Sequence, residues 1–154
     1  MDEPEPELHG AVLLVCRSLW YDHRYPERGY GLAGMLTHFE SPDGSDFPQR
    51  VERMFVYAQL WGTPGEYRLW VRLVRVDKVG YDEEVEVQLG AGGQPRNFPM
   101  PTSRPMEISG LNFIDEVAFP IESVPFGDVG VYEFQLWSDV SAEAIARYRI
   151  QARR

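Results

Sequence analysis

The sequence predicts an all-β fold, a two-sheet antiparallel β-sandwich of immunoglobulin-like or C2-like class with about eight or nine strands. Apolar runs of strand length alternate with clusters of glycine, proline and aspartate along the chain. No segment shows the apolar stripe of an amphipathic helix. We therefore expect strands at residues 10–20, 31–39, 53–61, 66–76, 83–90, 104–113, 115–119, 131–139 and 144–153.

Polar and glycine-rich segments separate these predicted strands. Residues 41–46 (SPDGSD) and 90–95 (GAGGQP) have the composition of loops. Residues 62–65 (GTPG) are shorter and lie between two apolar runs, which is the pattern of a tight β-hairpin. This interpretation makes the strands at 53–61 and 66–76 neighbours in one sheet.

The length of 154 residues is typical of one domain, which we place at residues 9–154. Residues 1–8 are acidic and proline-rich, so we expect a disordered tail there rather than the basic start of a signal peptide. No apolar run reaches the roughly 18 residues of a membrane span. The single cysteine, Cys16, cannot form an internal disulfide. Together these features predict a cytoplasmic protein.

The charge balance excludes two classes of partner. A formal net charge of −9 disfavours binding to nucleic acid and to anionic membranes, because both partners are themselves negative. Lys78 is the only lysine, so nearly all cations are arginines. Arginine is suited to planar stacking and bidentate recognition. The alternative explanation is a compositional bias of the whole genome.

Alternation along the strand at 131–139 predicts which of its side chains enter the core. Tyr132, Phe134 and Leu136 share one face, and Trp137 lies on the other. The same Gly-x-Tyr pattern begins at Gly65 and at Gly130, and we expect each to be a turn glycine followed by an inward tyrosine. The Tyr132 hydroxyl would then bond to the backbone upstream, as the tyrosine corner of β-sandwiches does.

Residues 130–134 (GVYEF) resemble the closing strand motif of small bacterial β-sandwich domains of uncharacterised function, written P-G-x-Y-x-F-x-L-x-x-D. The proline of that motif is absent here, where Asp128 and Val129 precede the glycine. Residues 14–18 (LVCRS), 29–34 (GYGLAG) and 65–69 (GEYRL), with Phe47-Pro48, resemble other parts of the same family. The resemblance extends loosely over residues 10–152. It implies a fold and brings no catalytic residues with it.

No pattern indicates catalysis, so we expect a protein that is not an enzyme and has no cofactor. Cys16 has His9, His23 and His38 as conceivable bases, but it lies in an apolar run where a buried, inert thiol is the norm. The serines lack a nucleophile elbow.

Carboxylates gather in loops without the spacing of a known metal site, and we expect no bound metal. One cluster lies at residues 22–27 and another at 40–46. A calcium site like that of C2 domains stays open as an alternative, through Asp77, Asp82 and Asp139.

Aromatic residues at outward positions are the remaining functional signal. If 53–61 and 66–76 form a hairpin, their outer faces are continuous, and we expect Trp137 to extend the same surface. Aromatics together with arginine are enriched in interface cores. The leading hypothesis is therefore a non-enzymatic interaction domain that binds a protein or a second copy of itself; a carbohydrate or small-molecule binder is the alternative. The alternative structural explanation is that loops cover this face. The candidate binding residues are Phe55, Tyr57, Trp61, Arg68, Trp70, Arg72 and Trp137.

Overall fold

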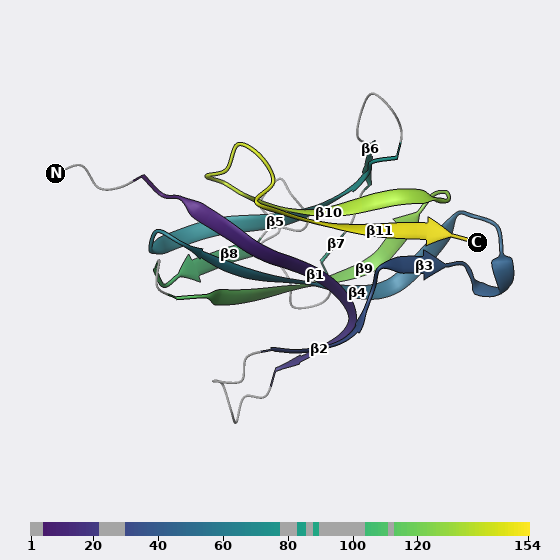
Figure 1. The fold of residues 1–154 in the computed structure, drawn as a ribbon, viewed down its shortest axis with the longest axis horizontal. Coiled ribbons are helices and arrows are strands. Elements are labelled where there is room, and N and C mark those ends of the chain that lie inside the picture. The colour runs from purple at the N-terminus through teal and green to yellow at the C-terminus, as the bar shows by residue number, and fades with distance from the viewer. Residues whose placement is uncertain (1–4, 22–29, 78–82, 86–87, 90–103, 111–112) are drawn as a thin grey trace.

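Two packed β-sheets make up the computed structural model, which describes residues 5–21, 30–77, 83–85, 88–89, 104–110 and 113–154 (Figure 1). These residues contain eleven strands and one short 3-10 turn, at Pro42–Gly44. The predicted all-β two-sheet sandwich is confirmed. The described part of the chain contains no helix that is long and apolar enough to cross a bilayer.

The first sheet, called sheet A here, has the strand order β2-β1-β4-β9-β7. Every pair of neighbours in it is antiparallel. The central strand, β4, pairs with β1 on one edge and with β9 on the other. The bounds are β1 (Leu8–Tyr21), β2 (Tyr30–Met35), β4 (Gln49–Gly62), β7 (Gln88–Leu89) and β9 (Asp115–Phe126).

The second sheet, called sheet B, has the order β3-β11-β10-β5-β6, and β8 also pairs with β5. Its pairs are antiparallel, except that β3 runs parallel to β11. Sheet B is therefore mixed, which the predicted purely antiparallel sandwich did not include. The bounds are β3 (His38–Glu40), β5 (Gly65–Arg75), β6 (Glu83–Val85), β8 (Arg104–Ile108), β10 (Gly130–Ser138) and β11 (Ala146–Arg153).

The core lies between the inner faces of the two sheets and follows the predicted alternation. Tyr132, Phe134 and Leu136 of β10 are fully buried in it. From β4, alternate residues face them across the sandwich: Met54, Val56, Ala58 and Leu60. The burial of alternate apolar side chains explains why these segments are strands, because only a period of two places them all on one face.

Two equivalent tyrosine corners anchor the central strands of sheet B. The Tyr132 hydroxyl donates to the carbonyl of Asp128 at 2.9 Å, and the Tyr67 hydroxyl donates to the carbonyl of Thr63 at 2.6 Å. Both bonds reach back four residues. Gly130 opens its strand where a Cβ atom would lie 2.7 Å from an Asp77 carboxylate oxygen, so a side chain there would have to displace that carboxylate. The predicted Gly-x-Tyr device is confirmed at both sites.

The predicted hairpin at residues 62–65 is wrong. Strands β4 and β5 belong to different sheets, so this turn carries the chain from sheet A to sheet B. Both edges of β4 near the turn are already occupied, by β1 and by β9. The Thr63 amide donates to the Glu7 carbonyl at 2.9 Å, which ties the corner to the start of β1. A short glycine-rich turn is compatible with either connection, and the competition for strand edges decides between them.

Strand β1 bends sharply where it leaves β4. Its pairing with β4 ends at Cys16, and the rest of the strand pairs with β2 instead. Figure 1 shows this second half of β1 lying with β2 apart from the other strands of sheet A, on the side away from sheet B. At the start of β2, Tyr30 packs edge-on against Tyr57 of β4 with ring centroids 6.0 Å apart. The β1–β2 hairpin therefore covers part of the outer face of sheet A.

Candidate functional site

The seven predicted binding residues divide between the two sheets. Phe55, Tyr57 and Trp61 lie on β4 in sheet A, whereas four others lie on β5 and β10 in sheet B: Arg68, Trp70, Arg72 and Trp137. The expected single aromatic surface is therefore wrong, because it depended on the hairpin between β4 and β5. The structure brings the sheet B residues together and separates them from the other three.

The three sheet A residues are not alike. Phe55 and Trp61 are half-buried, and the guanidinium carbon of Arg53 lies 5.2 Å from the Phe55 ring centroid, whereas Tyr57 is a structural residue. Tyr57 is only 3% exposed although it is outside the cluster between the sheets. Its hydroxyl donates to a carboxylate oxygen of Glu116 on β9, and it accepts from the Gln59 side-chain amide at 3.0 Å. Burial, and then the bond to Glu116, raise the pKa of Tyr57 to about 12. With Tyr30 packed on its ring, this residue serves the fold.

The sheet B group contains a tryptophan pair. Trp137 of β10 lies directly opposite Trp70 of β5, so the prediction that both belong to one sheet is confirmed. Side chains directly opposite in antiparallel strands have Cβ atoms about 5 Å apart and share a face. The guanidinium carbon of Arg72 lies over the Trp137 ring at 5.2 Å from its centroid, within range of a cation–π interaction.

A chain of hydrogen bonds fixes Trp137 in place. Its indole Nε1 donates to the Gln135 Oε1 at 3.0 Å, and the Gln135 Nε2 donates to a Glu133 carboxylate oxygen at 2.9 Å. The Nε of Arg149 on β11 then donates to the other Glu133 oxygen at 2.9 Å, and the Nε of Arg147 lies 3.4 Å from the first. Glu133 and Gln135 are each only 5% exposed, despite facing outward.

We call this surface the tryptophan–arginine face, formed by Trp70, Trp137, Arg68, Arg72, Glu133, Gln135, Arg147 and Arg149. Its four arginines against one glutamate give a formal charge of +3, within a chain of −9. The last four of these residues are not among the binding residues predicted from the sequence. Their signal was present as polar residues at alternate positions of both strands, but only the register of β10 with β11 shows that they meet.

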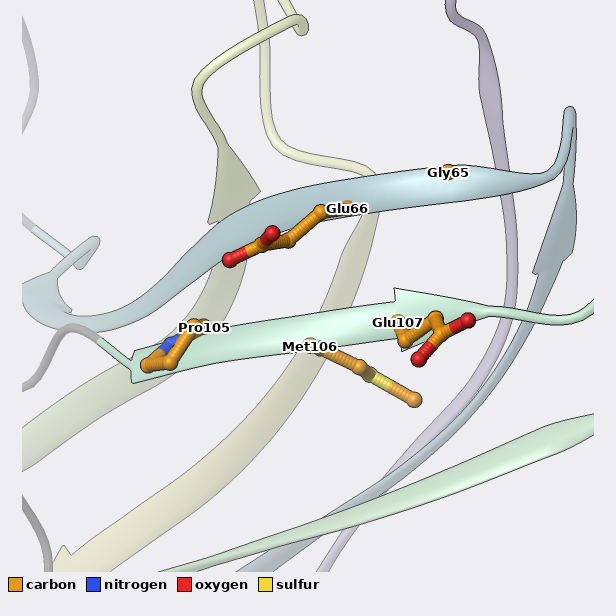
Figure 2. Close-up of a pocket in the computed structure, with 5 residues that line it drawn as sticks. All are labelled: Gly65, Glu66, Pro105, Met106 and Glu107. Carbon is orange, nitrogen blue, oxygen red and sulfur yellow. The ribbon is translucent and has the colours of Figure 1, made fainter.

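An acidic pocket borders this face on the side of β8. Glu66 of β5 and Glu107 of β8 lie directly opposite one another and are exposed. Figure 2 shows both carboxylates beside the pocket, which measures about 490 Å³ and is also lined by Gly65, Pro105 and Met106. Like charges directly opposite in a sheet destabilise the pairing. The two glutamates therefore make this edge of sheet B electrostatically distinct from its centre.

The carboxylates considered for calcium do not converge. Asp139 lies beside Arg68, whose backbone amide donates to its carboxylate at 3.2 Å. Asp77 lies nine residues after Arg68, beyond the end of β5, and this separation sets its distance from Asp139. At the rise of a strand this is roughly 30 Å. Asp77 is paired instead with Arg75 at 2.8 Å, which lowers the pKa of its carboxyl group. Asp82 lies outside the described residues.

The loop carboxylates are likewise held by arginines rather than grouped. Glu40 pairs with Arg153 at 2.9 Å, and Asp46 with Arg154 at 3.3 Å. The cluster at residues 22–27 lies outside the described part of the chain. Among the residues that are described, no three histidine, cysteine or acidic side chains are arranged to hold a metal ion.

Cys16 is fully buried at the bend of β1, as expected for an inert thiol. Burial is the main cause that raises the pKa of its thiol, which lowers the fraction of reactive thiolate. Of the histidines considered as bases, His9 lies near Glu7, at 4.0 Å, and His38 bonds to the Thr37 hydroxyl at 3.2 Å. His23 lies outside the described residues.

No protein-family model matches the chain, and a search of curated proteins found no match. The resemblance to small bacterial β-sandwich domains therefore depends on the short motifs alone.

Proposed function

We propose that this chain is a non-enzymatic, cytoplasmic interaction domain that binds an acidic protein through the tryptophan–arginine face. The observation that carries the proposal is the Trp70–Trp137 pair, with Arg72 stacked on it and the Glu133–Gln135 chain holding it. Tryptophan and arginine are the residue types most enriched among the dominant contacts of protein interfaces.

Preorganisation favours a binding role for this face. Ordering a long side chain at an interface costs about 0.5–1.5 kcal/mol, and that cost is avoided where the free protein already holds it. Trp137 is fixed by its bond to Gln135, and Glu133 is fixed by Arg149. A partner therefore meets a surface that is already in one arrangement.

Charge defines the partner. The face has a formal charge of +3 within a chain of −9, so it attracts acidic surfaces while the rest of the molecule repels them. Such complementarity raises the association rate and suppresses wrong partners. A second copy of this acidic chain satisfies the same requirement, which makes self-association one form of the proposal.

A carbohydrate ligand is less favoured by the position of Arg72. Sugars stack on an open aromatic face, whereas the Arg72 guanidinium lies over the Trp137 ring. The Arg72 guanidinium also adds a permanent positive charge beside the indole, which favours a partner that carries carboxylates over a neutral sugar.

The test compares the Trp70→Ser/Trp137→Ser double variant with Trp61→Ser, a matched outward tryptophan in sheet A. Light scattering over a range of concentrations measures self-association, and affinity capture with the immobilised domain identifies other partners. We expect one interaction that Trp61→Ser retains, that the double variant loses, and that weakens as salt rises.

Capture of the same proteins, or the same self-association, by the double variant overturns the proposal. Tryptophan-dependent binding on a glycan array, without a protein partner, establishes the carbohydrate alternative instead.

A further inference from the structure

A second candidate site lies in sheet A, where β1 departs from β4. A pocket of about 400 Å³ opens there, which is within the range of small ligand sites. Its lining includes six consecutive residues of β4, Gln49 to Met54. Consecutive residues of a strand point to opposite faces, so all six line one pocket only if it runs along the edge of the strand.

This edge of β4 has no strand beside it in the described structure. Pairing with β1 covers β4 only from Phe55 to Gly62, whereas β9 pairs with the opposite edge as far as Gln49. The remainder of β1 pairs with β2. Among the described residues, no other backbone hydrogen bond reaches Gln49–Met54. An open edge is a template for a further extended segment.

The floor of the pocket is apolar. Leu36 and Met54 line it and are buried in the core. Phe39, half-buried, lies beside them and stacks on Phe126 with ring centroids 5.2 Å apart. This floor accommodates an apolar side chain of moderate size.

One arginine at the pocket has a guanidinium left for a ligand. Arg50 donates to the Ser123 carbonyl at 2.9 Å, and Arg53 lies 4.0 Å from Glu122. Arg17 also lines the pocket and is exposed, and no described residue forms a hydrogen bond or an ion pair with it. Its position at the bend of β1 places a cation beside both the open edge and the apolar floor.

We propose that this site binds the C-terminal end of an extended peptide. The peptide backbone pairs with the β4 edge, its last side chain, an apolar one, enters the pocket, and its terminal carboxylate pairs with Arg17. Strand addition supplies affinity and a side-chain pocket supplies specificity in this mode of recognition. The site is on the other sheet from the tryptophan–arginine face, so either proposal can fail alone.

The experiment uses pentapeptides with the common sequence Ser-Thr-Val-Thr followed by Ala, Val, Leu or Phe, each with a free or an amidated C-terminus. Calorimetry measures affinity, and amide chemical shifts locate the site. We expect at least one free acid to bind about tenfold more tightly than its amide, because a charge-assisted bond is lost on amidation. Shifts should concentrate at Gln49–Met54.

The variant Arg17→Gln should remove the preference for the free acid, and Arg17→Lys should retain part of it. Arg153→Gln changes an exposed arginine of β11 that does not line the pocket, and it should leave the preference unchanged. The proposal is overturned if no peptide binds, if acid and amide bind equally, or if Arg17→Gln preserves the difference. Equal binding of decanoate at the same residues also overturns it, since that ligand needs no strand edge.

Discussion

The outer faces of the two sheets both carry aromatic residues at outward positions, yet Tyr57 of sheet A is covered in a way that the tryptophans of sheet B are not. On sheet A, Tyr57 is almost fully buried, with its hydroxyl bonded to Glu116 and its ring packed against Tyr30. On sheet B, Trp70 and Trp137 stay half-buried among arginines. The alternation of the sequence is the same in both strands.

An outward position in a strand is therefore not enough to define a binding surface. The second half of β1 folds back with β2 over part of sheet A, and Tyr57 becomes buried beneath Tyr30. The described residues place no comparable hairpin over the centre of sheet B. Tyr57 therefore has a structural role, whereas the tryptophan pair is the proposed binding site, and four measurements test this contrast.

The largest loss of stability should come from substitutions in the core between the sheets, and the other variants can be compared with this loss. Tyr132→Ala and Phe134→Ala should each lower the free energy of unfolding by about 3 kcal/mol or more, because both leave cavities between the sheets. Urea unfolding measures the change. A negligible shift of the midpoint for either variant would mean that β10 has the opposite face inward.

Tyr57 should behave as a core residue in its response to pH. Its pKa rises from 10.0 in the unfolded chain to about 12 in the fold, so above pH 10 only the unfolded state releases the proton. Stability should therefore fall as pH rises from about 10 to 12, by roughly 2–3 kcal/mol from this group.

The variant Tyr57→Phe should lose that part of the pH dependence. Burial also raises the pKa of Tyr148, so Tyr148→Phe is the matched control and should lose a different part. If Tyr57→Phe has the slope of the wild type, the outer face of sheet A is open to solvent, and the contrast between the sheets disappears.

Substitution of either tryptophan of the pair should lower the free energy of unfolding by less than substitution of a core residue. Trp70→Ser and Trp137→Ser should each destabilise by about 1 kcal/mol, the typical value for a partly exposed position, and the double variant should stay folded. Thermal unfolding measures this. Loss of folding, in place of loss of binding, would make both tryptophans part of the core.

The smallest effect concerns Cys16, which should hardly react with a thiol reagent in the native protein. It lies at the bend where β1 leaves β4, fully buried. Labelling then requires opening of the bend or global unfolding. Denatured protein should react at once. Rapid native labelling would show that the β1–β2 hairpin detaches readily and that sheet A is intermittently uncovered.

The fold class, the inward faces of the strands and the tyrosine corners could be predicted from the sequence, because these features depend on local spacing. A period of two places Tyr132, Phe134 and Leu136 on one side, and a turn glycine before tyrosine sets a bond four residues back. Most strand positions could also be predicted from the sequence. The predicted strand at 31–39 is divided into β2 and β3 at Leu36 and Thr37, and the one at 115–119 extends to Phe126.

Which strands share a sheet could not be predicted from the sequence and is known from the strand pairing in the structure. The sequence of residues 62–65 fits a hairpin and a corner between sheets equally well. The chain forms a corner because β1 and β9 occupy both edges of β4 beside that turn, which leaves no edge for β5. The candidate site therefore differs from the predicted one: Trp137 lies opposite Trp70 in sheet B, whereas Tyr57 is buried in sheet A. Strand pairing is a competition between segments distant in sequence, and alternation within one strand carries no information about its outcome.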